Sequence, residues 1–198
     1  MAFAYEWNTV ALDPASWRQQ MTAAAVDLVF IESAWAGNNR LWRGKLAGPS
    51  GPAPELVELL QWSRHNGIPT VFWNKEDPPH YQDFLPAAKL CDHVFTSDVR
   101  RVPFYRQDLG HEHIGVLPFA AQPAIHSPVR PRHGRHSREI AFAGMYFAHK
   151  YPERRSQMDL LLGGAMDASE KLATGLEIFS RKLGGDSNYQ FPAPLNTR

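Results

Sequence analysis

The sequence is poor in the residues that mark several classes of protein. Its 198 residues include a single cysteine, Cys91, which excludes an internal disulfide and a cysteine-based zinc site. The 21 basic and 20 acidic residues leave a formal net charge of +1, so nothing attracts the chain generally to nucleic acid or to an anionic membrane. This composition fits a reducing compartment, and we expect a cytoplasmic protein.

Long apolar runs and the common catalytic fingerprints are missing as well. No segment approaches the roughly 18 uninterrupted apolar residues of a membrane span, and residues 1–7 lack the pattern of a signal peptide. There is no G-x-G-x-x-G, no P-loop and no nucleophile elbow. The scattered histidines have no metal-ligand spacing with a supporting carboxylate, so we expect neither a metal nor a tightly bound cofactor. These histidines are His113, His126, His133 and His136.

What the sequence does show is a regular alternation of segments. Apolar runs of strand length occur at 27–31, 68–73, 92–96 and 113–118. Stretches with helical spacing or good helix formers precede them, at 14–25, 54–66, 81–91 and 99–109. Such alternation predicts a parallel sheet. The fold class we predict is therefore α/β, with a Rossmann-like parallel sheet flanked by helices.

The composition changes after residue 122. Segment 123–138 has three prolines, four arginines and no acid, which is typical of a linker. Contact of its arginines with a polyanion is the less favoured alternative. A strand at 139–143, a helix at about 152–164 and a strand at 175–180 then predict a partial βαβ unit. We thus expect a first domain over 1–122, a basic linker over 123–138 and a partial second unit over 139–198.

Two strand ends contain the candidate chemistry. Residues 27–39 and 71–79 both begin as apolar runs and then break into carboxylates, amides and a tryptophan. Open α/β sheets bind ligands at the edge where the carboxyl ends of their strands meet. A carboxylate there can be partly desolvated and act as a general base. The predicted catalytic residues are Asp77, Glu76 and Glu32.

Each of these carboxylates also has a simpler explanation, which is that it caps a helix or pairs with Lys75 or Arg43. Aromatic and amide side chains beside the acids favour a sugar ligand, because a flat ring suits the apolar face of a sugar. The alternatives are core packing for the tryptophans and a plain turn for the asparagines. The predicted substrate-binding residues are Trp35, Asn38, Asn39, Trp73 and Asn74.

A third group of residues lies between the strand and the helix of the second unit. Gly144, Met145 and Tyr146 occupy a position where backbone amides and a helix dipole can hold phosphate. Lys150 adds a cation nearby, although a solvated helix charge is the alternative. We predict these four residues as a donor phosphate site.

Four segments together resemble a known family. They are FIESAWAGNNRLWRGKL, PTVFWNKEDPPHYQDFLPAAKLCDHVFTSD, VLPFAAQPAIHSP and IAFAGMYFAHKYPERRSQMDLLL. Their order and spacing resemble the spore-maturation (CgeB-like) family of glycosyltransferases. The resemblance implies the GT-B architecture, in which an N-terminal domain presents the acceptor and a C-terminal domain holds a nucleotide-sugar. By motif, it implies an acceptor side of Glu32, Trp35 and Asn38, a cleft floor of Trp73, Glu76 and Asp77, and a diphosphate edge of Gly144 and Tyr146.

The activity implied is transfer of a sugar from a nucleotide-sugar donor to an unknown acceptor. Relatives of this type have a further strand before residue 3 and continue beyond residue 192, so we expect the donor half to be incomplete here. An incomplete sheet has an unpaired edge, which favours self-association or a complementary domain. The alternative function is a non-catalytic carbohydrate-binding or partner-binding module that assembles through this edge. We expect no membrane span and no nucleic acid partner.

Overall fold

The computed structural model describes residues 2–48, 51–126, 140–180 and 185–195. The chain forms two compact units, over 1–127 and 128–198. The division falls inside the segment that the sequence predicts as a linker. Residues 127–139 lie outside the described residues, and so do Arg130, Arg132, Arg135 and Arg138. The linker therefore stays a prediction.

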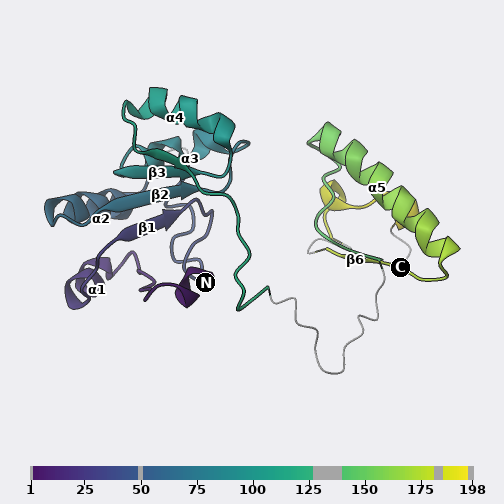
Figure 1. Cartoon of the computed structure of the whole chain (residues 1–198), viewed down its shortest axis with the longest axis horizontal. Helices are drawn as coiled ribbons and strands as arrows, with labels where there is room; N and C mark the ends of the chain where they lie inside the picture. The colour runs from purple at the N-terminus through teal and green to yellow at the C-terminus, as the bar shows by residue number, and fades with distance from the viewer. Residues whose placement is uncertain (1, 49–50, 127–139, 181–184, 196–198) are drawn as a thin grey trace. The chain divides into compact units, whose positions relative to one another are not determined.

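The first unit is built on four parallel strands. They are β1 (Val29–Glu32), β2 (Thr70–Asn74), β3 (His93–Thr96) and β4 (Ile114–Val116). They lie in the order β1-β2-β3-β4, and Figure 1 shows β1, β2 and β3 side by side. Because every pairing is parallel, all four carboxyl ends meet at one edge of the sheet. The predicted Rossmann-like α/β fold is confirmed.

Helices connect these strands. In chain order they are η1 (Ala2–Tyr5), α1 (Trp17–Ala23), α2 (Pro54–His65), α3 (Tyr81–Ala88), η2 (Val99–Arg101) and α4 (Val102–Leu109). Helix α2 begins with Pro54 and α4 is followed by the left-handed Gly110, as is common where helices begin and end. Helix α3 stops short of the predicted residue 91, because the amides of Leu90 and Cys91 turn back to Ala87 and Ala88 and direct the chain into β3.

The main core lies on one face of the sheet. Strands that are neighbours in chain order and have right-handed crossovers place their connecting helices on the same face. Val29, Phe72 and Val94 point into this core from three strands. The helices contribute Trp17, Met21, Leu56, Leu59, Leu60, Phe84 and Tyr105.

The opposite face is covered by the N-terminal segment. Phe3 packs against Phe30 with ring centroids 5.0 Å apart and against Trp73 at 5.9 Å. Trp7 packs against Phe30 at 5.5 Å. A parallel sheet is stable when both faces are covered, and here a 3₁₀ turn covers β1 and β2 in place of a helix.

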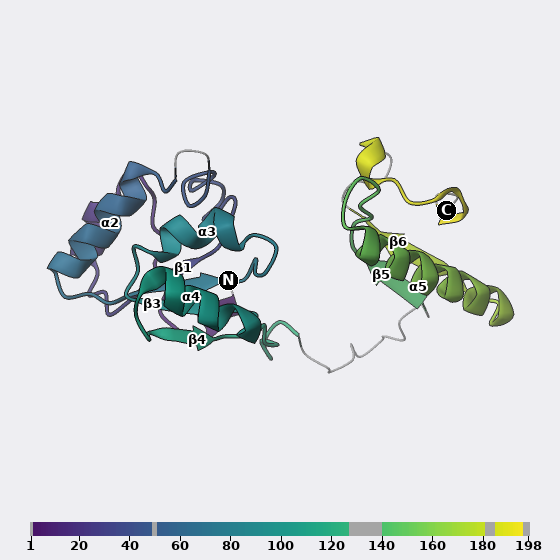
Figure 2. The same cartoon turned by 90° about the horizontal axis from the view of Figure 1, so that it is seen from above.

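The second unit contains a small parallel sheet and one long helix. Strands β5 (Ile140–Ala143) and β6 (Leu176–Phe179) pair with each other, and α5 (Pro152–Lys171) runs along them (Figure 2). Two 3₁₀ turns follow, η3 (Ser187–Tyr189) and η4 (Ala193–Leu195). The core consists of Tyr146, Met158, Leu162 and Phe191.

The predicted end of the helix at about 164 is wrong, because α5 continues through Gly163 and Gly164 to Lys171. A glycine inside a helix costs about 1 kcal/mol relative to alanine. Met158, Leu162 and Ser169 nevertheless keep one buried face across the pair, so packing outweighs local preference. In the described ranges no helix has both the length and the apolar character needed to cross a membrane.

Replacement of Phe72 by alanine tests the position of the core. Phe72 is 0% exposed at the centre of the sheet, so Phe72→Ala should lower the free energy of unfolding by about 3–5 kcal/mol. Phe119→Ala is the control, because Phe119 is 69% exposed and should cost about 1 kcal/mol or less. Urea denaturation measures both, and equal losses would contradict the assignment of the core.

Candidate functional site

The carboxyl edge of the first sheet brings the predicted acids together. Glu32 ends β1 and pairs in register with Trp73, and Asn74 ends β2 beside Thr96 of β3. The loop after β2 then presents Glu76 and Asp77. Residues that are 45 positions apart in the sequence thus meet at one edge, as the parallel sheet predicts.

Asp77 is the centre of a hydrogen-bond network. Its Oδ1 accepts from Asn74 Nδ2 at 2.9 Å. Its Oδ2 accepts from the hydroxyls of Thr96 at 2.6 Å and Tyr105 at 3.1 Å. Asn74 also donates to the Tyr105 hydroxyl at 2.8 Å. Because Asn74, Thr96 and Tyr105 are each 0% exposed, the carboxylate ties β2, β3 and α4 together from below the surface of the edge.

Burial raises the pKa of Asp77, because it removes the charged carboxylate from water. The hydrogen bonds from Thr96 and Tyr105 and the positive charge of Arg101 offset part of this shift. Both carboxylate oxygens are occupied by protein donors. Asp77 is therefore better suited to hold the edge in shape than to receive a proton from a ligand.

Glu32 is engaged in a different way. Its Oε2 lies 2.6 Å from Lys75 Nζ, and both side chains are about one-third exposed or less, at 33% and 27%. The ion pair joins the ends of β1 and β2. This is the pairing with Lys75 that the sequence left open as the simpler explanation, and it occupies the Glu32 carboxylate.

Glu76 is the carboxylate that remains. Its backbone N–H donates to Ser33 Oγ at 3.2 Å and to Asn74 Oδ1 at 3.1 Å, so the main chain is fixed. Ser33 is 0% exposed and also accepts from the Lys75 N–H at 2.9 Å. Within the part of the chain that the structure describes, no side chain or backbone group binds the Glu76 carboxylate, which is half-buried. Glu76 is thus fixed at its backbone and free at its acid group.

Trp35 lies at the same edge of the sheet, in the loop after β1. The residue is 45% exposed, and its ring makes edge contacts with His80 and Phe84, each with centroids 4.9 Å apart. One side of the indole is therefore anchored on α3 while much of the ring stays open to solvent. This arrangement suits a flat apolar ligand surface.

The structure moves two predicted substrate-binding residues away from direct contact. Trp73 is 7% exposed, packs under Phe3 and donates from its indole N–H to the Leu117 carbonyl at 2.8 Å. Asn74 is fully buried in the Asp77 network. The alternative for Trp73, core packing, is therefore what the structure shows. Phe72 points into the main core, so the next residue along the strand, Trp73, points to the opposite face, which Phe3 covers.

The two asparagines after Gly37 form part of a turn. Asn38 and Asn39 have φ values of 45° and 54°, which is the left-handed region that asparagine tolerates. Asn38 Nδ2 donates to the Leu12 carbonyl at 2.9 Å, so that side chain closes the loop. Asn39 is exposed and stays a predicted ligand-binding residue.

The predicted donor residues lie after β5, as expected, but several of their groups are already used. The Gly144 N–H donates to the Phe179 carbonyl at 3.0 Å. Tyr146 is 5% exposed and its hydroxyl donates to Asp159 at 2.8 Å, and burial first, then this acceptor, raises its pKa to about 12. Lys150 Nζ lies over the rings of Phe147 and Tyr151 at 5.1 and 4.9 Å.

Lys150 is thus the member of this group with a charge that can reach a phosphate from the surface, since it is exposed. Met145 is half-buried. The Tyr146 hydroxyl and the Gly144 amide already make hydrogen bonds within the unit, so both have structural roles. The donor phosphate site stays a prediction.

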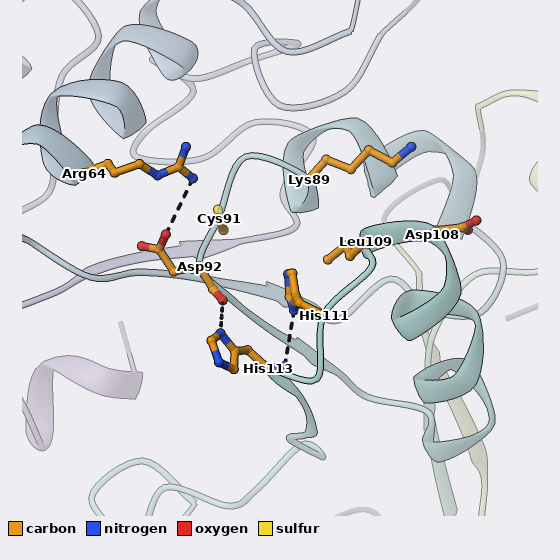
Figure 3. A pocket seen from close by; sticks show the side chains of 8 residues that line it. All are labelled: Arg64, Lys89, Cys91, Asp92, Asp108, Leu109, His111 and His113. Carbon is orange, nitrogen blue, oxygen red and sulfur yellow. Dashed lines mark hydrogen bonds and ion pairs between the residues drawn. The ribbon is translucent and has the colours of Figure 1, made fainter.

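A hollow of about 550 Å³ lies at the opposite edge of the first sheet, where β3 and β4 begin (Figure 3). Its walls are Arg64, Lys89, Cys91, Asp92, Asp108, Leu109, His111 and His113. Asp92 Oδ2 accepts from the backbone N–H and the hydroxyl of Thr70 at 2.9 and 2.7 Å. Burial alone would raise the pKa of Asp92, but these bonds and Arg64 lower it below its usual range.

The residues of this hollow have structural roles. Asp92 fastens the start of β3 to the start of β2, and burial raises the pKa of the Cys91 thiol to about 12, which leaves it neutral and unreactive. Ligands of open α/β sheets bind at the carboxyl edge instead. We therefore place the candidate site at the carboxyl edge and not at this hollow.

Metal ligands are not grouped at either edge. In the described ranges no cluster of three or more His, Cys, Asp or Glu side chains could hold a metal ion. His133 and His136 lie outside those ranges. At the carboxyl edge the sequence analysis missed Ser33, Thr96, Tyr105 and His80. Ser33 and Thr96 could have been found as polar residues at strand ends, whereas no local pattern marks Tyr105, which reaches the edge from α4.

No family model, curated protein or solved structure matches the chain. The comparisons assign no family, and function is inferred from the carboxyl edge and the motifs in the sequence.

Replacement of Ser33 tests the fixed main chain at the site. Ser33→Ala removes the acceptor of the Lys75 N–H, and a part-buried N–H without an acceptor costs about 1–2 kcal/mol. Ser16→Ala is the matched control, because Ser16 precedes α1 and its side chain makes no capping bond. Thermal or urea unfolding should show a loss for Ser33→Ala alone, and a similar loss for Ser16→Ala would contradict this role.

The raised pKa of Asp77 predicts a pH dependence. The folded state holds the Asp77 proton more tightly than the unfolded chain, so this group stabilises the fold in acid and the contribution is lost as pH rises above about 4. Asp77→Asn cannot titrate. The difference in unfolding free energy, wild type minus Asp77→Asn, should therefore fall as pH rises from about 4 toward 7. A difference that grows over this range would contradict the direction of the shift.

Proposed function

We propose that the first unit binds the saccharide acceptor of a nucleotide-sugar-dependent glycosyltransferase at its carboxyl edge. The observation that supports this function most strongly is the 45% exposed Trp35, which lies at the same edge of the sheet as Glu76, a carboxylate that no described residue binds. A sugar presents aliphatic hydrogens on one face and hydroxyls at its rim. An aromatic ring with an adjacent carboxylate is complementary to both surfaces.

Trp35 supplies the apolar surface in this proposal. The ring is held by His80 and Phe84 at two edge contacts, so little conformational freedom is lost when a ligand stacks on it. Trp7 has the same exposed fraction, 45%, but belongs to the covered face of the sheet. The two tryptophans therefore differ in location and not in accessibility.

Glu76 supplies the polar contact. Of the three predicted acids, Glu32 is paired with Lys75 and Asp77 is held by three donors. A carboxylate accepts hydrogen bonds from two adjacent sugar hydroxyls, and the Glu76 carboxylate is the one with both oxygens available. Its fixed backbone keeps the group close to the edge, which favours positioning of the acceptor.

The donor would be held by the second unit, with Lys150 near the diphosphate. The reaction transfers the sugar from the nucleoside diphosphate to the acceptor hydroxyl. Positive charge near the leaving diphosphate stabilises the developing anion. The second unit supports this role through its βαβ order and the exposed cation before α5, and nothing further in it identifies a nucleotide.

Saccharide titration of the full chain tests this function. Methyl glycosides of glucose, galactose, N-acetylglucosamine and rhamnose serve as probes in calorimetry. Trp35→Ala should weaken binding of whichever glycoside binds by at least about tenfold, because a lost stacking contact is worth about 1–2 kcal/mol. Trp7→Ala is the control and should leave the affinity within about twofold.

Two results contradict the proposal. One is that none of the glycosides binds the wild-type chain at millimolar concentration. The other is that Trp7→Ala and Trp35→Ala weaken binding equally, which would remove the site from the carboxyl edge. Release of nucleoside diphosphate from nucleotide-sugars in the presence of the bound glycoside separates a transferase from a module that only binds carbohydrate.

A further inference from the structure

His80 and Asp83 form a pair at the start of α3 that the sequence analysis did not single out. His80 Nδ1 lies 2.8 Å from Asp83 Oδ2. The two side chains are 29% and 51% exposed, so the pair lies at the surface of the edge and not in the core. His80 follows the end of β2 by six residues and contacts the Trp35 ring.

The pair fixes the chemistry of the imidazole. A carboxylate only accepts hydrogen bonds, so Nδ1 must be the nitrogen that holds the proton. In the neutral ring Nε2 is then left as an acceptor. Among the described residues no donor binds Nε2, and the ring is oriented on one side by Asp83 and on another by Trp35.

We propose that His80 is the general base of this edge and that Asp83 is its positioning residue. The inference rests on the proposed function, because the proton it removes belongs to a saccharide hydroxyl bound on Trp35. It adds the group that activates the acceptor.

His80 Nε2 takes the proton of the acceptor hydroxyl while the hydroxyl oxygen forms a bond to the anomeric carbon of a nucleotide-sugar. The bond from that carbon to the diphosphate oxygen breaks, and its electron pair leaves with the nucleoside diphosphate. Attack from the side opposite the leaving group inverts the anomeric carbon. His80 then returns its proton to water.

The neighbouring acids favour this assignment. The predicted bases Asp77 and Glu32 are occupied, one by three hydrogen-bond donors and one by Lys75. Imidazole is the side chain that most often takes part in proton transfer as a general base. Glu76 then binds sugar hydroxyls, and the proton goes to His80.

The competing explanation is that the two residues only stabilise the helix start. They are three positions apart, and an exposed pair of this kind at the first turn adds a few tenths to 1 kcal/mol at most. That role would change unfolding slightly when either residue is replaced, and it would leave the ligand contact and the rate unaffected. These two quantities therefore separate the two explanations.

Nuclear magnetic resonance of the ¹⁵N-labelled full chain tests the tautomer and the contact. His80→Gln assigns one of the nine imidazole signals. We expect wild-type His80 to hold its proton on Nδ1, and Asp83→Leu to lose this preference. Addition of the methyl glycoside that binds should shift Nε2 of His80, whereas His65, exposed at the end of α2, should not move.

Nucleoside diphosphate release from uridine, guanosine and thymidine diphosphate sugars tests the base. With the bound glycoside as acceptor, His80→Gln should lower the rate about 100-fold or more while the glycoside affinity stays within about threefold. His65→Gln is the control and should keep the full rate.

Two results would overturn the assignment of His80 as the base and leave saccharide binding by Trp35 in place. One is that His80→Gln keeps more than half of the wild-type rate. The other is that the wild-type chain binds the glycoside without releasing any nucleoside diphosphate. A glycoside that shifts Trp35 but not His80 would do the same. A chain that binds no glycoside would remove the proposed function and this inference together.

Discussion

The carboxyl edge depends on one half-buried group, the carboxylate of Asp77. It accepts from Asn74 of β2, Thr96 of β3 and Tyr105 of α4, and so links these three elements. A charge in such a place is stable because hydrogen bonds replace the water it loses. The loop that contains Glu76 and leads to His80 starts from this anchor, and the geometry of the candidate site follows from it.

Around that anchor the ionisable groups have separate tasks. Glu32 is neutralised by Lys75, which joins β1 to β2, and Ser33 fixes the amides of the loop between them. Among the described residues, nothing binds the Glu76 carboxylate or Nε2 of His80, and the His80 ring contacts Trp35. At the opposite edge Asp92 uses its oxygens in the same structural way, since it accepts from Thr70 and pairs with Arg64.

The sequence predicted the sheet and its edge well, because both follow from local signals. Apolar runs predicted the four strands, and the polar residues that end β1 and β2 indicated the candidate site. Roles within the site depend on three-dimensional neighbours. Trp73 and Trp35 look alike in the sequence. Trp73 lies in a strand and faces the N-terminal segment, whereas Trp35 lies in a loop and is partly exposed to solvent. Tyr105 bonds to Asp77, 28 residues away in the sequence. Helix α5 continues through two glycines because side-chain packing outweighs the low helix propensity of glycine.

The central claim is that a saccharide binds at the carboxyl edge of the first unit. Backbone amide shifts in the full chain during titration with a methyl glycoside test it most directly, because they report every edge of the sheet at once. The account predicts the largest shifts in the loops after β1 and β2, around Trp35, Glu76 and His80. Shifts concentrated instead around Lys89, His111 and His113, at the amino edge, would contradict it.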